Sequence, residues 1–271
     1  MPLNIPGLIV PFQLLFYPRL ALPAVVVKDI RQLDWAALKA AGYRGAVFDK
    51  DNCLTIPHND TLVPQLQDAW SDCLHTFGPG NVLIVSNSAG THLDPGGIQA
   101  ESVSYHLRVP VLTHRSLKPA YTCITSIRTY FASLASPIRD GELIVVGDRI
   151  FTDIIMANRM ALKSSKAPLS VAEAKTTTSN SRQEALIPTN EKEPDVASRG
   201  PLAIWTTGVW QKESMAMRWC EQKLVDRVRV WTNSDPSVYY GRRFVKREVV
   251  EEMPVAKRPW YWPPPMGNEK A

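Results

Sequence analysis

The sequence predicts an α/β protein with a doubly wound parallel sheet, and two observations carry this prediction. Short apolar runs within residues 45–49 and at residues 82–85, 143–146 and 202–205 alternate with segments whose apolar residues recur at helical spacing. Strands without apolar–polar alternation are typical of a parallel sheet that helices cover on both faces. Polar and acidic residues follow these runs, at the strand ends where such sheets bind ligands.

The helices are expected from apolar periodicity and from end signals. The clearest has apolar residues at helical spacing from Val63 to Phe77 and is ended by Gly78-Pro79-Gly80. Asp94-Pro95 has the pattern of an N-cap followed by proline at the first helical position. Further helices are expected at 121–134, 154–162 and 210–230, and a further strand at 109–112.

Length and charge limit the class of protein. The chain has 271 residues, 45% of them hydrophobic, and a formal net charge of +5. This length supports one sizeable core, and the positive balance favours anionic partners such as phosphate esters, nucleic acid or anionic lipid. The four cysteines lack paired metal-ligand spacing and do not form a disulfide framework, so a reducing compartment is expected.

The domain organisation follows from shifts in composition. Residues 1–44 are interpreted as an apolar N-terminal arm, and residues 45–271 as a single domain. Arg19 is the one charge between Met1 and Val27, and the prolines at 6, 11, 18 and 23 argue against a membrane-spanning helix there. The arm could pack on the core, lie at a membrane interface or serve as an import signal. Within the domain, 163–200 is expected to be a disordered polar insertion, and 236–271 a basic, aromatic tail.

Four polar clusters stand at the ends of predicted strands or at the helix start that follows one. Asp49 and Asp51 end the first strand, Ser86 and Asn87 the second, and Lys118 opens a helix after the third. The last cluster joins Gly147 to an acidic pair, Asp148 and Asp153. Each cluster alone is weak evidence, because paired acids, capping serines and solvated lysines are common. Their occurrence in this order, each near the carboxyl edge of one sheet, indicates a single site for phosphate chemistry.

In this pattern the sequence resembles the haloacid dehalogenase-type phosphatases, whose D-x-D-x-[T/V] motif precedes a serine or threonine, a lysine and an acidic pair. Cys53 stands where that motif has Thr or Val. The longer strings Phe48–Leu54 and Gly147–Asp153 resemble the mitochondrial phosphatidylglycerophosphate phosphatases of fungal type. The resemblance spans residues 45–162 and the strand near Leu202. It implies a Rossmann-type fold that lacks a cap domain, because the intervals between the motifs leave no room for one.

The resemblance also implies a mechanism and its residues. Asp49 is expected to be the nucleophile that forms an aspartyl phosphate, and Asp51 the general acid and base. Asp49, the backbone carbonyl of Asp51, and Asp148 are expected to bind Mg²⁺. Ser86, Asn87 and Lys118 are expected to bind the phosphate. Asp153, Asn52 and Arg149 are expected to support the site.

The implied reaction is the conversion of phosphatidylglycerophosphate to phosphatidylglycerol, a step towards cardiolipin at the matrix side of the mitochondrial inner membrane. The expected partners are therefore a phospholipid substrate and an anionic membrane, with no nucleic acid. An open site also suits a homo-oligomer in which a neighbouring subunit helps to shape it. The basic, aromatic tail, with Trp260-Tyr261-Trp262, supports peripheral membrane association.

Other classes fit less well. A phosphatase acting on phosphoprotein or on nucleic-acid ends remains an alternative with the same chemistry. A catalytically dead binding module would be expected to have lost Asp49, Asp51, Lys118 or Asp148, and all four are present. No cysteine is followed six positions later by arginine, which argues against a cysteine-dependent phosphatase, and the histidines lack the spacing of a zinc site.

Overall fold

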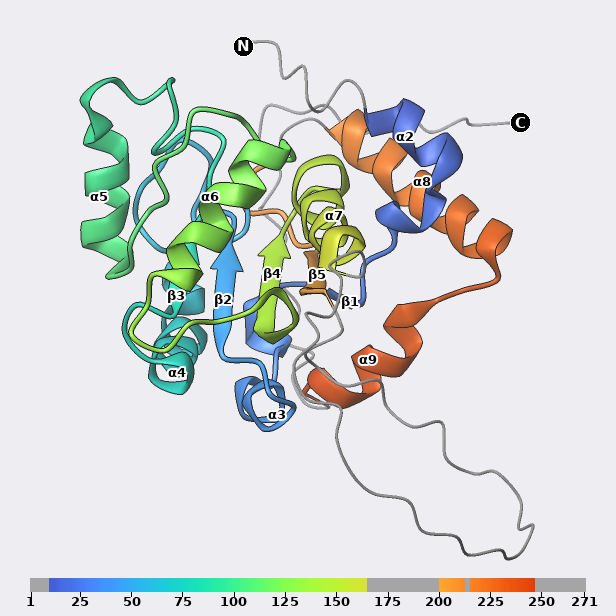
Figure 1. The fold of residues 1–271 in the computed structure, drawn as a ribbon, viewed down its shortest axis with the longest axis horizontal. Helices are drawn as coiled ribbons and strands as arrows, with labels where there is room; N and C mark the ends of the chain where they lie inside the picture. Colours follow the sequence, from blue (N-terminus) through green and yellow to red (C-terminus); the bar gives the residue numbers. More distant parts are fainter. Residues whose placement is uncertain (1–9, 165–199, 213–214, 247–271) are drawn as a thin grey trace, which may run out of the picture.

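In the computed structural model, which describes residues 10–164, 200–212 and 215–246, the apolar runs form one parallel five-stranded sheet (Figure 1). The strand order is β1-β5-β4-β2-β3, and every neighbouring pair is parallel. The strands are β1 (Val25–Val27), β2 (Gly45–Phe48), β3 (Val82–Ile84), β4 (Leu143–Gly147) and β5 (Leu202–Thr206). This arrangement confirms the predicted α/β fold.

Successive residues of a strand point to opposite faces of the sheet, so the fully apolar strands place apolar side chains on both faces. Helices cover both faces and bury these side chains. Ala46 and Phe48 share one core with α3 and α4, whereas Val47 belongs to a second core with α6 and α7. The α-helices are α2 (Val10–Phe16), α3 (Trp35–Ala40), α4 (Gln67–Phe77), α5 (Ile98–Leu107), α6 (Tyr121–Ala132), α7 (Ile155–Ser164), α8 (Met215–Thr232) and α9 (Pro236–Phe244). The helix predicted to end at Gly78 is α4, preceded by a 3-10 turn at Pro64–Leu66.

The N-terminal segment differs from the expected arm. Val25–Val27 forms β1, which pairs with β5 in the register Val25↔Ile204. Val25 and Val27 are buried in the core, and α3 packs on the same face of the sheet. The domain boundary expected at residue 45 therefore lies too late in the sequence, because apolar residues before it complete the sheet.

Residues 109–112 differ from the expected strand. Val111 forms only an isolated bridge with Ile84, although backbone hydrogen bonds join Ile84 N to Pro110 O and Leu112 N to Ile84 O. Pro110 has no N–H to extend the ladder. This segment therefore lines the edge of β3 without becoming a sixth strand among the described residues.

The C-terminal elements also differ in their bounds. The helix expected from residue 210 is α8, which begins at Met215; the backbone N–H of Gln211 instead donates to Asn52 Oδ1. Part of the expected tail folds as α9, whose Phe244 is buried and packs its ring edge-on against Tyr43. Residues 165–199 of the expected insertion and 247–271 of the tail lie outside the described residues.

The intervals around the predicted motifs contain no additional domain. Between β2 and β3 the chain forms a loop, a 3-10 turn and α4; between β3 and Lys118 it forms a second short 3-10 turn (Pro95–Gly97) and α5. The carboxyl edge of the sheet is thus free of a cap among the described residues. Within the same residues, no helix combines the length and apolar content that crossing a bilayer requires.

Candidate active site

The register of β2 and β4 brings two acids together at the carboxyl edge of the sheet. Phe48 pairs with Val146, so Asp49 lies one residue and Asp148 two residues beyond this pair on adjacent strands. The backbone N–H of Asp49 donates to Val146 O at 2.9 Å, which fixes the start of the loop. This placement follows directly from parallel pairing of two apolar strands.

Lys118 joins the first and last acidic motifs. Its Nζ donates to Asp49 Oδ1 at 2.6 Å and to Asp153 Oδ1 at 2.7 Å. The lysine side chain is 3% exposed. Its backbone N–H donates to Asn87 Oδ1 at 2.7 Å, so Asn87 positions the residue. Burial disfavours the ammonium, but the carboxylates of Asp153 and Asp49 outweigh it and raise the pKa of Lys118, so the lysine stays charged.

Asp153 reaches the sheet because the chain turns tightly after β4. It lies in a π-helical turn, Ile150–Ile154, where its Oδ2 accepts from the backbone N–H of Arg149 at 3.2 Å and from Thr152 Oγ1 at 3.1 Å. A Cβ atom at Gly147 would lie 2.3 Å from Asp153 Cγ. Glycine is therefore required at 147 by the close approach of the Asp153 side chain.

Three carboxylates form the acidic cluster of this site, defined as Asp49, Asp148 and Asp153. One ligand atom from each lies within 4.8 Å of the others. Burial raises the pKa of Asp49 and raises that of Asp148 well above its ordinary value, and repulsion within the cluster adds to both effects. Hard carboxylate oxygens at this spacing suit a divalent cation such as Mg²⁺.

Arg218 is a site residue that the sequence did not reveal. It comes from α8, is 7% exposed at its side chain, and forms an ion pair with Asp148 through Nη2. Trp205 Nε1 also donates to the backbone carbonyl oxygen of Asp148, at 3.0 Å. The motif spacing contains no sign of this contact, because an arginine on an amphipathic helix is usually solvated. Arg149 lies farther from Asp148, with 3.6 Å between Nε and Oδ2.

The carboxylate of Asp51 contacts residues outside the acidic cluster. It pairs with Lys50 Nζ at 2.7 Å and accepts from Ser88 Oγ at 3.1 Å and from the backbone N–H of His58 at 3.2 Å. Its side chain is 34% exposed, so it is accessible to solvent and to a leaving group, while the Lys50 side chain is fully buried. The structure thus separates two acids that are two residues apart.

Ser86 and its neighbours form a polar chain that leads to Asp51. The hydroxyl oxygens of Ser86 and Ser88 are 2.9 Å apart, and Ser88 in turn donates to Asp51. His114, buried beneath this loop, has Nε2 3.0 Å from the carbonyl oxygen of Ser86 and Nδ1 2.7 Å from that of Ser116. Burial lowers the pKa of His114, and the positive charge of Lys118 lowers it further.

Asn52 braces the loop that carries Asp49 and Asp51. Its φ of 57° is left-handed, a conformation that asparagine tolerates better than most residues, and its backbone N–H donates to Thr55 O at 2.8 Å. Its Oδ1 accepts from the backbone N–H of Gln211 at 3.1 Å. Through this contact the loop after β2 is tied to the segment before α8.

The fold and site define a doubly wound α/β protein whose carboxylate cluster and buried lysine can hold a divalent cation beside a phosphate group. Residues 5–165 match the family model described as mitochondrial PGP phosphatase. The chain belongs to this family, and the matched residues include every member of the acidic cluster and Lys118.

Named relatives agree with this assignment. The chain is 45% identical over 141 residues to the chloroplastic phosphatidylglycerophosphate phosphatase 1 of Chlamydomonas reinhardtii, a match that covers 52% of this chain and 50% of the relative. It is 39% identical over 174 residues to the chloroplastic/mitochondrial protein of Arabidopsis thaliana, over 63% and 48% of the two chains. It is 35% identical over 182 residues to the mitochondrial phosphatidylglycerophosphatase of Saccharomyces cerevisiae, over 64% and 96%.

The length of these matches differs between the relatives. The chain spans about half the length of the algal and plant proteins and nearly all of the yeast protein. No solved structure matches the chain.

Proposed function

We propose that this protein hydrolyses the terminal phosphate ester of phosphatidylglycerophosphate to give phosphatidylglycerol and inorganic phosphate. Family membership and the names of the relatives support the substrate. The observation that carries the reaction class is the buried contact of Lys118 with both Asp49 and Asp153. It joins a carboxylate nucleophile to a fixed positive charge at the edge of the sheet where ligands bind.

Asp49 is the proposed nucleophile. One of its carboxylate oxygens forms a bond to phosphorus as the bond from phosphorus to the lipid oxygen breaks, which leaves an aspartyl phosphate. Asp51 gives the proton that the departing lipid oxygen needs. In the second step Asp51 takes a proton from water, whose oxygen attacks phosphorus and releases phosphate from Asp49. The exposed Asp51 side chain suits both proton transfers, whereas the cluster acids are nearly buried.

Asp49, Asp148 and Asp153 would hold Mg²⁺, together with the backbone carbonyl of Asp51. The cluster fits this ion because its ligands are hard oxygens that lie within 4.8 Å of one another. The ion would reduce repulsion between the nucleophile and the phosphate dianion. Lys118, charged and fixed by two carboxylates, would bind a phosphoryl oxygen, with Ser86 and Asn87 beside it.

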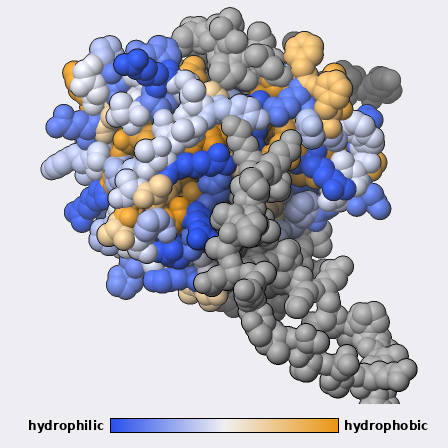
Figure 2. Space-filling view, in the orientation of Figure 1, coloured by the Kyte–Doolittle hydropathy of each residue, from blue (hydrophilic) through white to orange (hydrophobic). Residues whose placement is uncertain are grey.

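The proposed setting is the matrix side of the mitochondrial inner membrane, on the route to cardiolipin, with peripheral attachment to anionic lipid. Three relatives carry mitochondrial in their names. Helix α2 also exposes Phe12, Leu15 and Phe16, which are 68%, 68% and 79% accessible. Figure 2 shows apolar side chains gathered at this corner of the molecule. Aromatic and aliphatic residues in such a group favour a lipid interface.

Asp49→Asn tests the reaction, because the change is nearly isosteric and removes the nucleophilic charge. Phosphate release would be measured from phosphatidylglycerophosphate in liposomes, from a phosphopeptide and from a 5′-phosphorylated oligonucleotide. We expect hydrolysis of the lipid alone, and its loss in Asp49→Asn. Asp68→Asn, an exposed acid on α4, is the matched control and should retain full activity. Preference for the peptide or oligonucleotide would overturn the proposed substrate; full activity of a folded Asp49→Asn protein would overturn the mechanism.

A further inference from the structure

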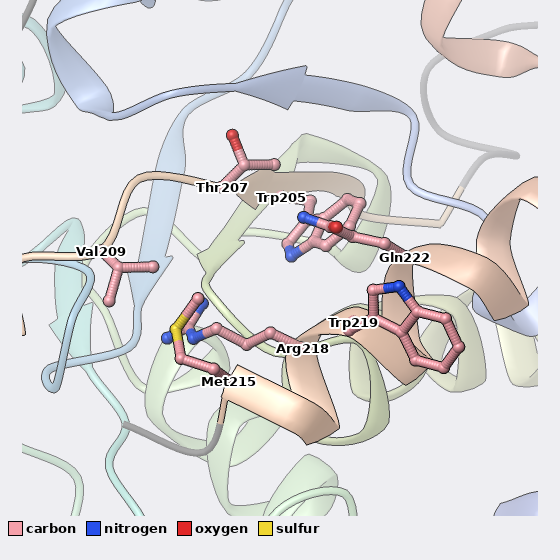
Figure 3. A pocket seen from close by; sticks show the side chains of 7 residues that line it. All are labelled: Trp205, Thr207, Val209, Met215, Arg218, Trp219 and Gln222. Carbon is pink, nitrogen blue, oxygen red and sulfur yellow. The ribbon is translucent and has the colours of Figure 1, made fainter. Parts of the chain in front are cut away.

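A cavity of about 190 Å³ lies beside the active site, between the end of β5 and α8 (Figure 3). Trp205 of β5 lines this cavity, together with four residues of α8: Met215, Arg218, Trp219 and Gln222. No motif predicted from the sequence includes this group of residues. None of the expected catalytic or phosphate-binding residues lines the cavity, so it is a separate feature of the protein.

The cavity and the acidic cluster share a wall. Arg218 pairs with the Asp148 carboxylate, and Trp205 Nε1 donates to the Asp148 carbonyl oxygen at 3.0 Å. A ligand in the cavity is therefore separated from the cluster by Asp148 and its two partners. Arg218 and Trp205 therefore each contact both Asp148 and the cavity.

Arg218 lines the cavity and has an incompletely satisfied donor. Its side chain is 7% exposed, and Nη2 is taken by Asp148. Its Nε is buried and has no hydrogen-bond partner within the described residues. A buried donor without an acceptor carries a free-energy penalty that a bound anionic oxygen would remove. Arginine is also the side chain best suited to bind a phosphate oxygen in a partly desolvated site.

The cavity mouth is apolar. Trp219 and Met215 stand there, 60% and 49% exposed, which is unusual for large apolar side chains. A cavity of this volume is smaller than the roughly 300–1,000 Å³ that encloses a whole drug-sized ligand. It therefore fits one segment of a larger molecule that carries an anion next to hydrocarbon.

We propose that this cavity binds the phosphodiester of the lipid substrate, with Arg218 donating to a phosphodiester oxygen and Trp219 and Met215 packing against the glycerol and the first acyl carbons. This inference rests on the proposed function, because phosphatidylglycerophosphate carries a phosphodiester in addition to the phosphate ester that is cleaved. It assigns specificity for a lipid to α8, whereas the chemistry of bond cleavage belongs to the strand ends.

The test uses a ligand that has the phosphodiester but lacks the terminal phosphate ester that the enzyme is proposed to cleave. Short-chain phosphatidylglycerol would be titrated into the full-length protein by calorimetry below its critical micelle concentration, so that no bilayer contributes. Glycerophosphoglycerol, which lacks acyl chains, and a short-chain diacylglycerol, which lacks phosphate, would be compared with it. We expect the complete lipid to bind more tightly than either part.

Trp219→Ala should weaken binding of short-chain phosphatidylglycerol about three- to tenfold, the effect of losing one aromatic contact. Trp231→Ala is the matched control, since Trp231 lies on the same helix, is 67% exposed and does not line the cavity. Met215→Ala, with Met217→Ala as its control, repeats the comparison with a smaller side chain. Arg218→Gln should abolish the preference for phosphatidylglycerol over diacylglycerol.

The outcomes separate this inference from the proposed function. Equal binding by wild type and Trp219→Ala, or an equal loss in Trp231→Ala, would overturn the cavity assignment even if the enzyme hydrolyses the lipid. Failure to hydrolyse phosphatidylglycerophosphate, with lipid binding that still depends on Trp219, would overturn the proposed function alone. Should Arg218→Gln fail to fold, the tryptophan and methionine pairs still decide the question.

Discussion

Replacing Lys118 by methionine should destabilise the protein strongly, because the lysine is the cation between two buried acids. Its Nζ lies 2.6 Å from Asp49 Oδ1 and 2.7 Å from Asp153 Oδ1, and its side chain is 3% exposed. Methionine keeps most of the volume and removes the charge. Asp49 and Asp153 would then lose their shared partner, and Arg218 would remain as the buried cation paired with the cluster.

The expected cost is about 3–5 kcal/mol, which is the usual effect of removing one partner from a buried ion pair. That is a large share of the roughly 5–15 kcal/mol that stabilises a typical domain. The difference in free energy of unfolding between wild type and Lys118→Met should become smaller as pH falls. Burial already raises the pKa of Asp49, and loss of Lys118 raises it further, so protonation of Asp49 in the folded state removes charge that burial disfavours.

Urea denaturation followed by circular dichroism, with chelator present, measures this effect at about pH 7.5 and about pH 5.5. Lys39→Met, an exposed lysine on α3, is the control and should change the free energy of unfolding by less than about 0.5 kcal/mol. A Lys118→Met protein within about 1 kcal/mol of wild type at the higher pH would refute the reasoning. So would a deficit that grows on acidification.

Three further predictions concern the same edge of the sheet. Gly147→Ala should lower kcat about a hundredfold by displacing Asp153, whereas Gly241→Ala, where a Cβ meets nothing within 4 Å, should leave kcat unchanged in the same assay. Burial lowers the pKa of His114 below 6.5, so the unfolded chain binds a proton more readily than the folded protein, and this residue makes wild type lose stability on acidification. Unfolding curves should show that His114→Asn loses less stability than wild type as pH falls, by up to about 1.4 kcal/mol per pH unit. Chelation should abolish phosphate release, Mg²⁺ should restore it and Ca²⁺ should not, because Ca²⁺ takes more ligands at longer distances; activity that survives exhaustive chelation would exclude the metal role of the acidic cluster.

Local patterns predict the sheet core and most of the site. Each apolar run is long enough for one buried strand, and a polar residue follows it, so the proximity of Asp49 to Asp148 follows from parallel pairing. Lys118, which the sequence predicts to bind phosphate, lies in contact with both Asp49 and Asp153. These features depend on neighbours in sequence or on adjacent strands.

The missed features depend on distant pairing. Val25–Val27 is an apolar run among prolines, and nothing near it in the sequence shows that it pairs with β5. Arg218 has the sequence surroundings of a solvated helix residue, and its contact with Asp148 exists only because α8 crosses the carboxyl edge of the sheet. The carboxylate of Asp51 similarly turns towards Lys50 and Ser88 through loop geometry that residue types do not specify.

The position of β1 has a consequence for the order of assembly on the ribosome. β1 lies at the edge of the sheet and pairs only with β5 among the described strands. The hydroxyl of Thr207 donates to the carbonyl oxygen of Val27, 180 residues earlier in the chain. The segment that forms β1 must therefore wait until β5 has been synthesised before the two strands can pair. Contacts of such long range form slowly, so the nascent chain exposes the unpaired edge of this segment in the interval.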